Sequence, residues 1–203
     1  MDEILILNGS PRAPRSNSLR YAKLFADCWA GTAHIQAVTA GNHLELCREV
    51  GRNSRLLLVF PLYADSIPVT LLNFLKTLEE NPPENKPTVS VLINCGFLEW
   101  RQNDTAVQMV ELFCRQNGYP FGSVLELGSG EAILDSPFRG IAARRIKKLA
   151  AAVAKGESRR FHGAMPLTKG LFLRAADSYW VSYGKKFGVT REQMETMEIE
   201  GGG

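Results

Sequence analysis

The segment after the first predicted strand carries polar residues suited to holding a phosphate group. Residues 8–20 read NGSPRAPRSNSLR, in which Gly9 permits a ligand to approach the backbone closely. Hydroxyl, amide and backbone donors gather where a helix is predicted to begin, at Ser10, Ser16, Asn17 and Ser18. A helix start binds phosphate through unpaired N–H groups and the helix dipole, and Arg12 and Arg15 add positive charge. The pattern predicts a phosphate site, and the alternative is a serine-rich helix cap without a ligand.

A second candidate loop follows the third predicted strand. Residues 60–68 read FPLYADSIP, so that Pro61 ends the strand and Ser66 with Pro68 begins a helix. The residues expected to face a ligand at this rim are Pro61, Leu62, Tyr63, Ala64 and Asp65. A tyrosine and backbone amides suit the edge of a flat aromatic ligand. The alternative is a tight connection in which Tyr63 packs on its own loop.

A third candidate loop follows the fourth predicted strand, where residues 94–101 read NCGFLEWR. The residues expected to lie against a ligand are Asn94, Cys95, Gly96 and Phe97. Phe97 and Trp100 are expected to form an apolar wall. The Cys95 thiol is expected to be unreactive, because nothing nearby in the sequence lowers its pKa. The run Gly128-Ser129-Gly130 after the fifth strand permits close approach of a ligand, but it is a weak signal by itself.

Common catalytic patterns are absent from the sequence. No G-K-[ST] follows the first loop and no G-x-G-x-x-G precedes an acidic residue, which argues against a Walker A site and a standard NAD-binding half. There is no G-x-S-x-G elbow and no aspartate pair after the first strand. The histidines fall outside the candidate loops, at His34, His43 and His162. We therefore expect no catalytic side chain, and a bound cofactor that carries the chemistry.

Alternating strand and helix patterns supply a scaffold for these loops. Strands are expected at Ile4–Asn8, His34–Val38, Arg55–Phe60, Thr88–Asn94 and Val124–Leu127. Helices are expected at Ser16–Ala30, Leu44–Val50, Ser66–Glu80, Asp104–Asn117 and Pro137–Lys155. This alternation predicts a flavodoxin-like α/β/α sandwich with a five-stranded parallel sheet of order 2-1-3-4-5. Ligands bind such sheets at the carboxyl ends of the strands, beside the reversal of strand order, where the candidate loops lie.

Composition bounds the class of protein. The 203 residues are 45% hydrophobic and 22% charged, with a formal net charge of +3, which is typical of a globular domain and not of a disordered or fibrous chain. The apolar stretch Leu56–Ala64 is too short to span a membrane, and no basic signal-peptide region opens the sequence. The four cysteines form no C-x-x-C pair. We expect a reduced, cytoplasmic protein without a metal site.

Positive charge is concentrated in one segment. Between Arg139 and Arg160 lie eight basic residues and one acidic residue, Glu157, so the segment carries +7 and the remainder of the chain −4. Apolar residues at helical spacing, among them Ile146 and Leu149, indicate that the charges form the solvated face of an outer helix. No aromatic residues interleave with the charges, and we expect neither nucleic acid nor a membrane as a partner.

The pattern changes near the carboxyl terminus. Aromatic residues recur every three or four positions and predict an apolar stripe on a long helix, at Phe172, Tyr179, Trp180, Tyr183 and Phe187. We interpret residues 1–160 as the flavodoxin-like domain and residues 161–203 as a helical extension of the same structural unit. The stripe is expected to cover the rim of the site or a second subunit of a homodimer. The alternative is a helix packed on its own domain.

Three segments together resemble one known family. LNGSPRxxRSNS near the start, PLYADSIP after the third strand and NCGF after the fourth are similar to motifs of the flavodoxin-like NAD(P)H-dependent FMN reductase and quinone reductase superfamily. The resemblance covers about residues 1–155. The later segment MPLTK…W…KKFGVT resembles an extension of some bacterial members, with less specificity. Related iron–sulfur flavoproteins carry a cysteine cluster before the third strand, where this chain has only Cys47.

The resemblance implies non-covalently bound FMN. The FMN phosphate would lie on Ser10, Ser16, Asn17 and Ser18, with Arg12 nearby. The isoalloxazine ring would lie between residues 61–65 and residues 94–97. Hydride would pass from NADPH or NADH to the flavin, and from the flavin to a small acceptor such as a quinone, a flavin, an azo compound or a nitro compound. No side chain needs to exchange a proton with the substrate in this scheme.

Two other functions are compatible with the same fold. One is a flavodoxin-type electron carrier without a substrate of its own, although such carriers are typically strongly acidic and this chain has a net charge of +3. The other is a binding module that holds no flavin.

Overall fold

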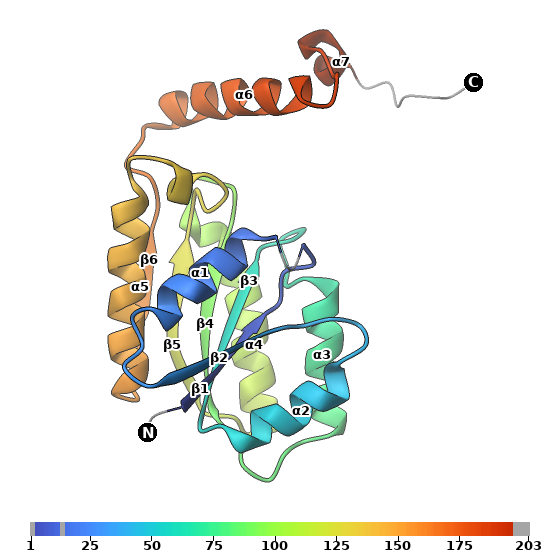
Figure 1. The fold of residues 1–203 in the computed structure, drawn as a ribbon, viewed down its shortest axis with the longest axis vertical. Helices are drawn as coiled ribbons and strands as arrows, with labels where there is room; N and C mark the ends of the chain where they lie inside the picture. Colours follow the sequence, from blue (N-terminus) through green and yellow to red (C-terminus); the bar gives the residue numbers. More distant parts are fainter. Residues whose placement is uncertain (1–2, 13–14, 197–203) are drawn as a thin grey trace, which may run out of the picture. The chain divides into compact units, whose positions relative to one another are not determined.

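The computed structural model describes residues 3–12 and 15–196. A six-stranded parallel sheet of order β2-β1-β3-β4-β5-β6 lies at its centre (Figure 1). The strands are β1 Glu3–Asn8, β2 Thr32–Ala37, β3 Arg55–Pro61, β4 Thr88–Asn94, β5 Phe121–Leu127 and β6 Arg160–Gly163. The α-helices that follow them are α1 Asn17–Ala26, α2 His43–Arg52, α3 Val69–Glu80, α4 Asp104–Asn117 and α5 Arg139–Ala154. Two short 3₁₀ turns, η1 Trp100–Asn103 and η2 Ile133–Asp135, follow β4 and β5. The predicted fold class is confirmed.

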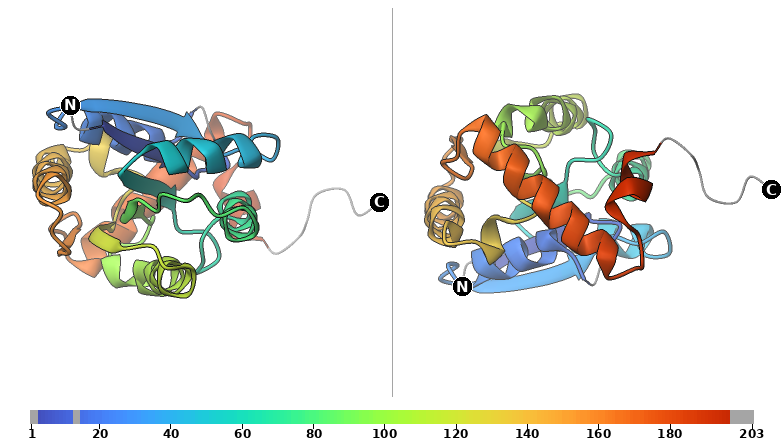
Figure 2. Two further views of the ribbon diagram at one scale, coloured as in Figure 1. Left: turned by 90° about the horizontal axis from the view of Figure 1, so that it is seen from below. Right: turned by 90° about the horizontal axis from the view of Figure 1, so that it is seen from above.

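Helices cover both faces of the sheet (Figure 2). Helices α1 and α5 pack together on one face, and α2, α3 and α4 cover the other. The central strands are apolar on both sides because each side faces a helical layer. In β3, for example, Leu57 and Leu58 point to opposite faces and both are fully buried.

The sheet has one more strand than the sequence pattern predicts. β6 pairs in parallel with the outer edge of β5, with Leu125 opposite Phe161. It has only four residues, RFHG, and one of them is buried, so it shows neither an apolar run nor a clear alternation. Its connection is also unusual. Helix α5 lies on the face of α1, so the β5–α5–β6 crossover has the opposite hand to the other crossovers.

Helix α5 accounts for the concentrated positive charge. Its apolar side is buried through Ala142, Ile146, Leu149 and Val153. Arg144, Lys147 and Lys148 on the other side are exposed. The predicted solvated face is confirmed. No helix within the described residues is long and apolar enough to cross a membrane.

The chain divides into two compact units, residues 1–165 and 166–203. The first unit ends five residues beyond the predicted boundary because β6 joins the sheet. The second unit contains α6 Lys169–Lys185 and α7 Arg191–Glu195. Thr168 caps α6, and Thr190 with Gln193 forms a capping box on α7. That the two parts form one structural unit stays a prediction.

Candidate functional site

Hydrogen bonds beyond the strand ends bring the candidate loops together at the carboxyl edge of the sheet. The N–H of Gly9 donates to the carbonyl of Val59 at 2.9 Å, and the N–H of Leu62 donates to the carbonyl of Asn94 at 2.8 Å. The N–H of Cys95 donates to the carbonyl of Leu127 at 2.9 Å. The loops after β1, β3, β4 and β5 are therefore neighbours in that order. The reversal of strand order falls at β1, between β2 and β3.

Asn8 organises the first loop. Its Oδ1 accepts the N–H of Ser10 at 3.1 Å, and its Nδ2 donates to Ser16 Oγ at 3.4 Å. Ser16 is the N-cap of α1 and accepts the N–H of Leu19 at 3.1 Å. Ser10 Oγ accepts the N–H of Arg12 at 3.3 Å. These bonds fold the loop back over the start of α1.

The first loop keeps donors for an anion. A serine hydroxyl has one hydrogen and two lone pairs, and the bonds to Ser10 and Ser16 use the lone pairs. Both hydroxyl hydrogens remain available. The first N–H groups of α1 have no partner inside the helix, because no earlier turn accepts them. Arg12 and Arg15 are exposed and enter no ion pair within the described part of the chain. This arrangement suits a phosphate.

The side chains of Asn17 and Ser18 also connect the candidate loops. Asn17 Nδ2 donates to the carbonyl of Glu131 at 3.0 Å. Ser18 is buried, and its Oγ accepts Asn94 Nδ2 at 3.2 Å. Asn94 Nδ2 also donates to the carbonyl of Phe60 at 3.1 Å. These side chains tie the loops to one another. The assignment of Asn17 and Ser18 to a phosphate stays a prediction.

The loop after β3 forms a strained hairpin turn. Tyr63 and Ser66 exchange two backbone hydrogen bonds, of 3.0 and 2.9 Å, around Ala64 and Asp65. Ala64 has φ 47° and Asp65 has φ 55°, the signs that a type I′ turn needs at both central residues. Glycine and asparagine usually occupy such positions, and other residues cost about 1–2 kcal/mol each. The turn is exposed, as predicted, and its strain marks a candidate site.

The loop after β4 presents Gly96 and Phe97. Gly96 faces open space, and the Phe97 side chain is 53% exposed. Cys95 beneath them is buried, and burial raises the pKa of its thiol to about 11. The apolar wall of Phe97 and Trp100 stays a prediction, and the structure shows one further contact of Trp100. The Trp100 ring stacks on His162 of β6, with 4.2 Å between the ring centroids.

The loop after β5 is more important than its weak sequence signal suggests. Ser129 has φ 55° and donates its N–H to the carbonyl of Phe97. Gly130 donates its N–H to the carbonyl of Cys95 at 2.7 Å and accepts the hydroxyl of Tyr21 at 2.8 Å. A Cβ on Gly130 would lie 2.7 Å from the Cβ of Asn94. This loop therefore holds the Asn94–Phe97 loop in place from behind.

Glu126 is a buried carboxyl group that sequence reasoning did not single out. It lies on β5 with only 2% of its surface exposed, and its Oε1 has no hydrogen-bond partner among the described residues. Burial raises its pKa to about 7, and Asp104 at the start of α4 adds to the increase, while Arg160 opposes it. The only feature of the sequence that indicates this group is a single acidic residue within an otherwise uncharged strand.

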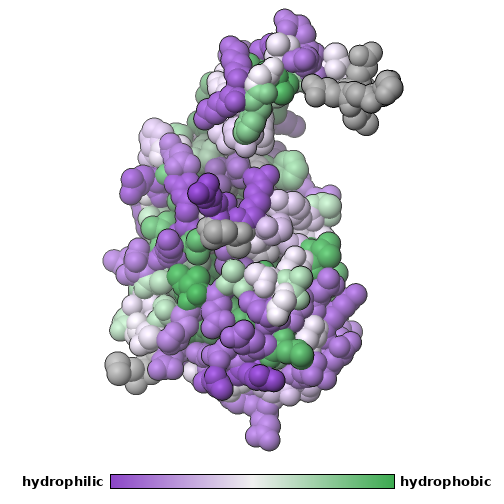
Figure 3. Space-filling model, turned by 45° about the vertical axis from the view of Figure 1, so that its right-hand side comes forward, coloured by the Kyte–Doolittle hydropathy of each residue, from purple (hydrophilic) through white to green (hydrophobic). Residues whose placement is uncertain are grey.

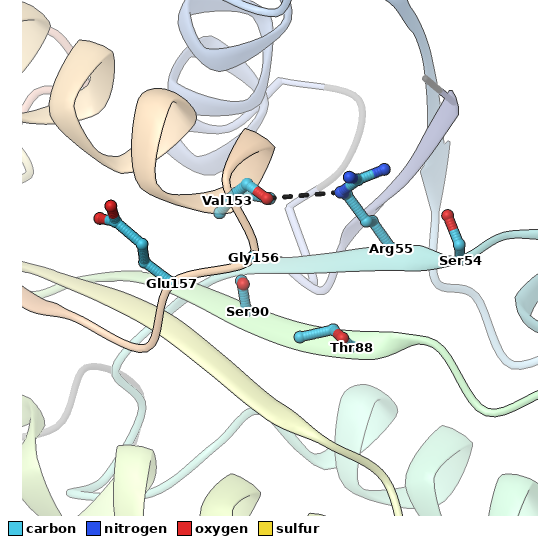
Figure 4. A pocket seen from close by; sticks show the side chains of 7 residues that line it. All are labelled: Ser54, Arg55, Thr88, Ser90, Val153, Gly156 and Glu157. Atoms are coloured by element: carbon cyan, nitrogen blue, oxygen red, sulfur yellow. Dashed lines mark hydrogen bonds between the residues drawn. The ribbon is translucent and has the colours of Figure 1, made fainter. Parts of the chain in front are cut away.

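A shallow cavity at the amino-terminal edge of the sheet offers no comparable site. It has a volume of about 180 Å³ and lies beside Ser54 and Thr88, which precede or begin strands (Figure 4). Arg55 extends along it and donates to the carbonyl of Val153 at 3.3 Å, at the end of α5. That bond gives Arg55 a structural role in holding α5 to the sheet. The candidate site is therefore the carboxyl edge.

Comparisons with known proteins identify the fold. The chain matches no protein-family model, and no curated protein has a detectably similar sequence. Solved structures do match. A rubredoxin oxygen:oxidoreductase from Desulfovibrio gigas has a TM-score of 0.58 and 11% identity over 76% of this chain. The match spans only 36% of that longer protein.

Two reductases match over nearly their whole length. An NAD(P)H:quinone oxidoreductase from Methanothermobacter marburgensis has a TM-score of 0.57 and 14% identity, covering 74% of this chain and 95% of its own. An FMN-dependent NADH-azoreductase from Bacillus anthracis, solved with FMN, has a TM-score of 0.57 and 12% identity, covering 76% and 100%. Flavodoxins also match. At these identities the likeness establishes a flavodoxin-like fold.

Proposed function

We propose that this chain is a flavin-dependent NAD(P)H oxidoreductase. It would pass a hydride from NADPH or NADH, by way of bound FMN, to a small acceptor such as a quinone, a flavin, an azo compound or a nitro compound. The observation that carries the proposal is the convergence of a capped helix start with exposed loops at one edge of a flavodoxin-like sheet. The reductases that share the fold support the same class.

The first loop fits the phosphate of FMN. The hydroxyl hydrogens of Ser10 and Ser16 and the N–H groups of Asn17 and Ser18 are the donors we assign to it. Arg12 supplies positive charge from an exposed position. Hydrogen bonds to a charged acceptor contribute about 1.5–3 kcal/mol each, so a few such donors suffice for tight binding.

The second and third loops fit the edge of a flat ring. The positive φ values of Ala64 and Asp65 give this exposed turn a backbone path that common turns do not follow. In the loop after β4, the space beside Gly96 is open. Tyr63 and Phe97 present exposed aromatic side chains at the two sides. We assign the ring to the space between residues 61–65 and 94–97.

When bound, FMN supplies the two-electron chemistry that no side chain of this site provides. The role of the protein is to bind and orient. Backbone N–H groups of the exposed loops would hold the ring, and donors placed in advance would stabilise negative charge on it. Cys95 keeps its proton at neutral pH because its pKa is raised to about 11, so it serves as packing and not as a nucleophile.

We also propose a cytoplasmic location. All four cysteines are free thiols, and Cys47, Cys95 and Cys114 are each buried. A protein that carries free thiols in this way suits a reducing compartment.

A titration of the purified chain with FMN tests the proposal. Binding would quench or shift flavin fluorescence, and Ser16→Ala would weaken FMN binding about 10-fold to 100-fold, because it removes one donor to a charged group. Ser158→Ala is the matched control. It removes one serine hydroxyl, which donates to the carbonyl of Phe121 at the opposite edge of the sheet.

Each outcome of the titration has a definite meaning. If the wild-type chain takes up no FMN, the function proposed here is wrong. If FMN binds but Ser16→Ala and Ser158→Ala bind it equally well, the phosphate lies elsewhere.

A further inference from the structure

A pocket lies between α5 and β6, which run side by side (Figure 1). Residues from 148–155 line one side of it and residues from 157–161 line the other, and we call it the α5–β6 pocket. Its volume is about 210 Å³, below the range of about 300–1,000 Å³ that is typical of sites for drug-sized ligands, so it suits a small group. Because β6 starts at the amino-terminal edge of the parallel sheet, the pocket is separate from the candidate site at the carboxyl edge.

The α5 side of the pocket combines two lysines with two small residues. Lys148 and Lys155 are seven positions apart, which places them about 20° apart around the helix. Ala151 and Ala152 lie between them on the same side of α5. The alanine side chains are too short to fill the space, and the lysines border it with positive charge.

A tight turn at the end of α5 brings the chain back to form the other side. Gly156 has φ 66°, and its N–H donates to the carbonyl of Val153 at 3.1 Å. The N–H of Glu157 donates to the carbonyl of Ala152 at 3.0 Å, which completes a Schellman motif. Carbonyls at a helix end carry partial negative charge, and these bonds lessen the repulsion that an anion would meet there.

The β6 side of the pocket is held in place by a buried serine. Ser123 Oγ accepts the N–H of Arg159 at 3.1 Å and donates to the carbonyl of Glu157 at 2.6 Å. Ser123 itself is fully buried. The guanidinium of Arg159 lies over the ring of Phe161, 5.7 Å from its centroid. The backbone of this wall is therefore fixed before a ligand arrives, which lowers the entropy cost of binding.

The charge of the lining is unbalanced. Three basic side chains and one acidic side chain give it a net charge of +2. Lys148 and Lys155 enter no ion pair within the part of the chain that the structure describes, and Arg159 meets Glu157 only at 3.5 Å on the surface. Hydrophilic residues are common over the surface shown in Figure 3, so exposed charge alone marks no site. Here the excess charge borders a pocket, and an anion can contact several donors at once.

We propose that the α5–β6 pocket binds the phosphate groups of a polyphosphate anion, either inorganic or carried by a nucleoside. Lysine ammonium groups bind phosphate as point charges, and the guanidinium of Arg159 can bind two phosphate oxygens together. An anion with two or more charges matches the net charge of the lining. Phe161 and the guanidinium beside it offer a flat surface to a base. The proposal does not rest on the proposed function, because it uses no residue of the FMN site.

Calorimetric titration of the full chain with tripolyphosphate, in magnesium-free buffer of low ionic strength, tests the site. We expect one site per chain, and about 10-fold weaker binding for Lys148→Gln, which removes one charged donor at a partly solvated position. Lys147→Gln is the matched control. It removes the same charge from the next position of α5, about 100° around the helix and outside the pocket, and should weaken binding less than about 2-fold.

Three results would overturn the proposal. The first is no binding at about 1 mM tripolyphosphate. The second is an equal loss in Lys147→Gln and Lys148→Gln, which would indicate a diffuse attraction to polyanions. The third is a loss in Ser16→Ala without a loss in Lys148→Gln, which would place the anion at the loop after β1. We expect Ser16→Ala to bind tripolyphosphate as the wild type does. A chain that fails to bind FMN does not affect these results.

ATP distinguishes the two sources of the phosphate groups, because it carries the same three phosphates with a nucleoside attached. Equal affinities for ATP and tripolyphosphate would show that the phosphate chain alone is recognised. Tighter binding of ATP that Phe161→Leu reduces to the level of tripolyphosphate would identify a nucleoside polyphosphate. In either case Lys148→Gln should weaken ATP binding about 10-fold, and unchanged ATP binding in this variant would overturn the proposal for nucleotides.

Discussion

Replacing Glu126 by glutamine should make the stability of the protein much less dependent on pH. The Glu126 carboxyl is buried, and its pKa rises from an ordinary value of 4.5 to about 7. The folded chain therefore binds a proton between pH 4.5 and pH 7 that the unfolded chain has released. Its stabilising contribution is complete below pH 4.5 and is lost as the pH rises through 7.

The magnitude follows from the size of the pKa shift. About 2.5 pH units at 1.36 kcal/mol per unit correspond to about 3 kcal/mol, most of it developing between pH 5 and pH 8. Glutamine resembles the protonated carboxyl and can donate to Asp104, but it does not ionise. We expect Glu126→Gln to unfold with nearly the wild-type free energy at pH 5, and to be about 3 kcal/mol more stable than the wild type at pH 8.

Urea unfolding at a series of pH values measures this difference directly. Glu80→Gln, which removes an exposed carboxylate from the end of α3, is the matched control and should follow the wild-type profile. Parallel profiles for the wild type and Glu126→Gln would refute the reasoning. They would mean that the buried carboxyl is ionised at neutral pH, with Arg160 or water compensating its charge.

Three further substitutions test the structure around the site. Gly130→Ala should destabilise the protein by about 1–3 kcal/mol in urea unfolding and weaken FMN binding, because its Cβ would lie 2.7 Å from the Asn94 Cβ. Gly96 faces open space, so the control Gly96→Ala should change the free energy of unfolding by less than about 0.5 kcal/mol. Asp65→Gly should raise the free energy of unfolding by about 0.5–1 kcal/mol, because glycine adopts a φ of 55° without the strain that aspartate has there. The control Asp27→Gly, at a φ of −63°, should lower the free energy of unfolding. A stabilised Asp27→Gly protein would contradict this explanation. Arg191→Ala should leave the unfolding midpoint of the first unit within about 1 °C, since its ion pairs lie on the exposed surface of the second unit; a larger shift measured by thermal unfolding would show that the two units unfold together.

The central strands were predictable because their chemistry is local. Arg55–Phe60 is apolar on both faces, and only a strand between two helical layers requires this. The strand β6 was not predictable from the same rules. Its four residues show no pattern, and a further parallel strand after α5 needs a crossover of the rarer hand. The packing of α5 against α1 determines its position.

The candidate site was predictable in its location but not in its internal bonds. The three loops lie at strand ends in the sequence, and parallel strands bring those ends to one edge. The pairing of Ser18 with Asn94 joins residues 76 positions apart, and no local pattern shows it. The stack of Trp100 on His162 depends on β6 in the same way. The positive φ values of Ala64 and Asp65 were hidden because neither residue type favours them.

Anaerobic mixing of the FMN-loaded chain with NADPH, and separately with NADH, tests the central claim most directly. The account predicts that at least one nicotinamide cofactor rapidly removes the visible absorbance of the flavin, and that adding a quinone restores it. If the flavin stays oxidised with both cofactors while dithionite reduces it, the chain holds flavin without accepting hydride. That result would contradict the reductase function and favour an electron carrier.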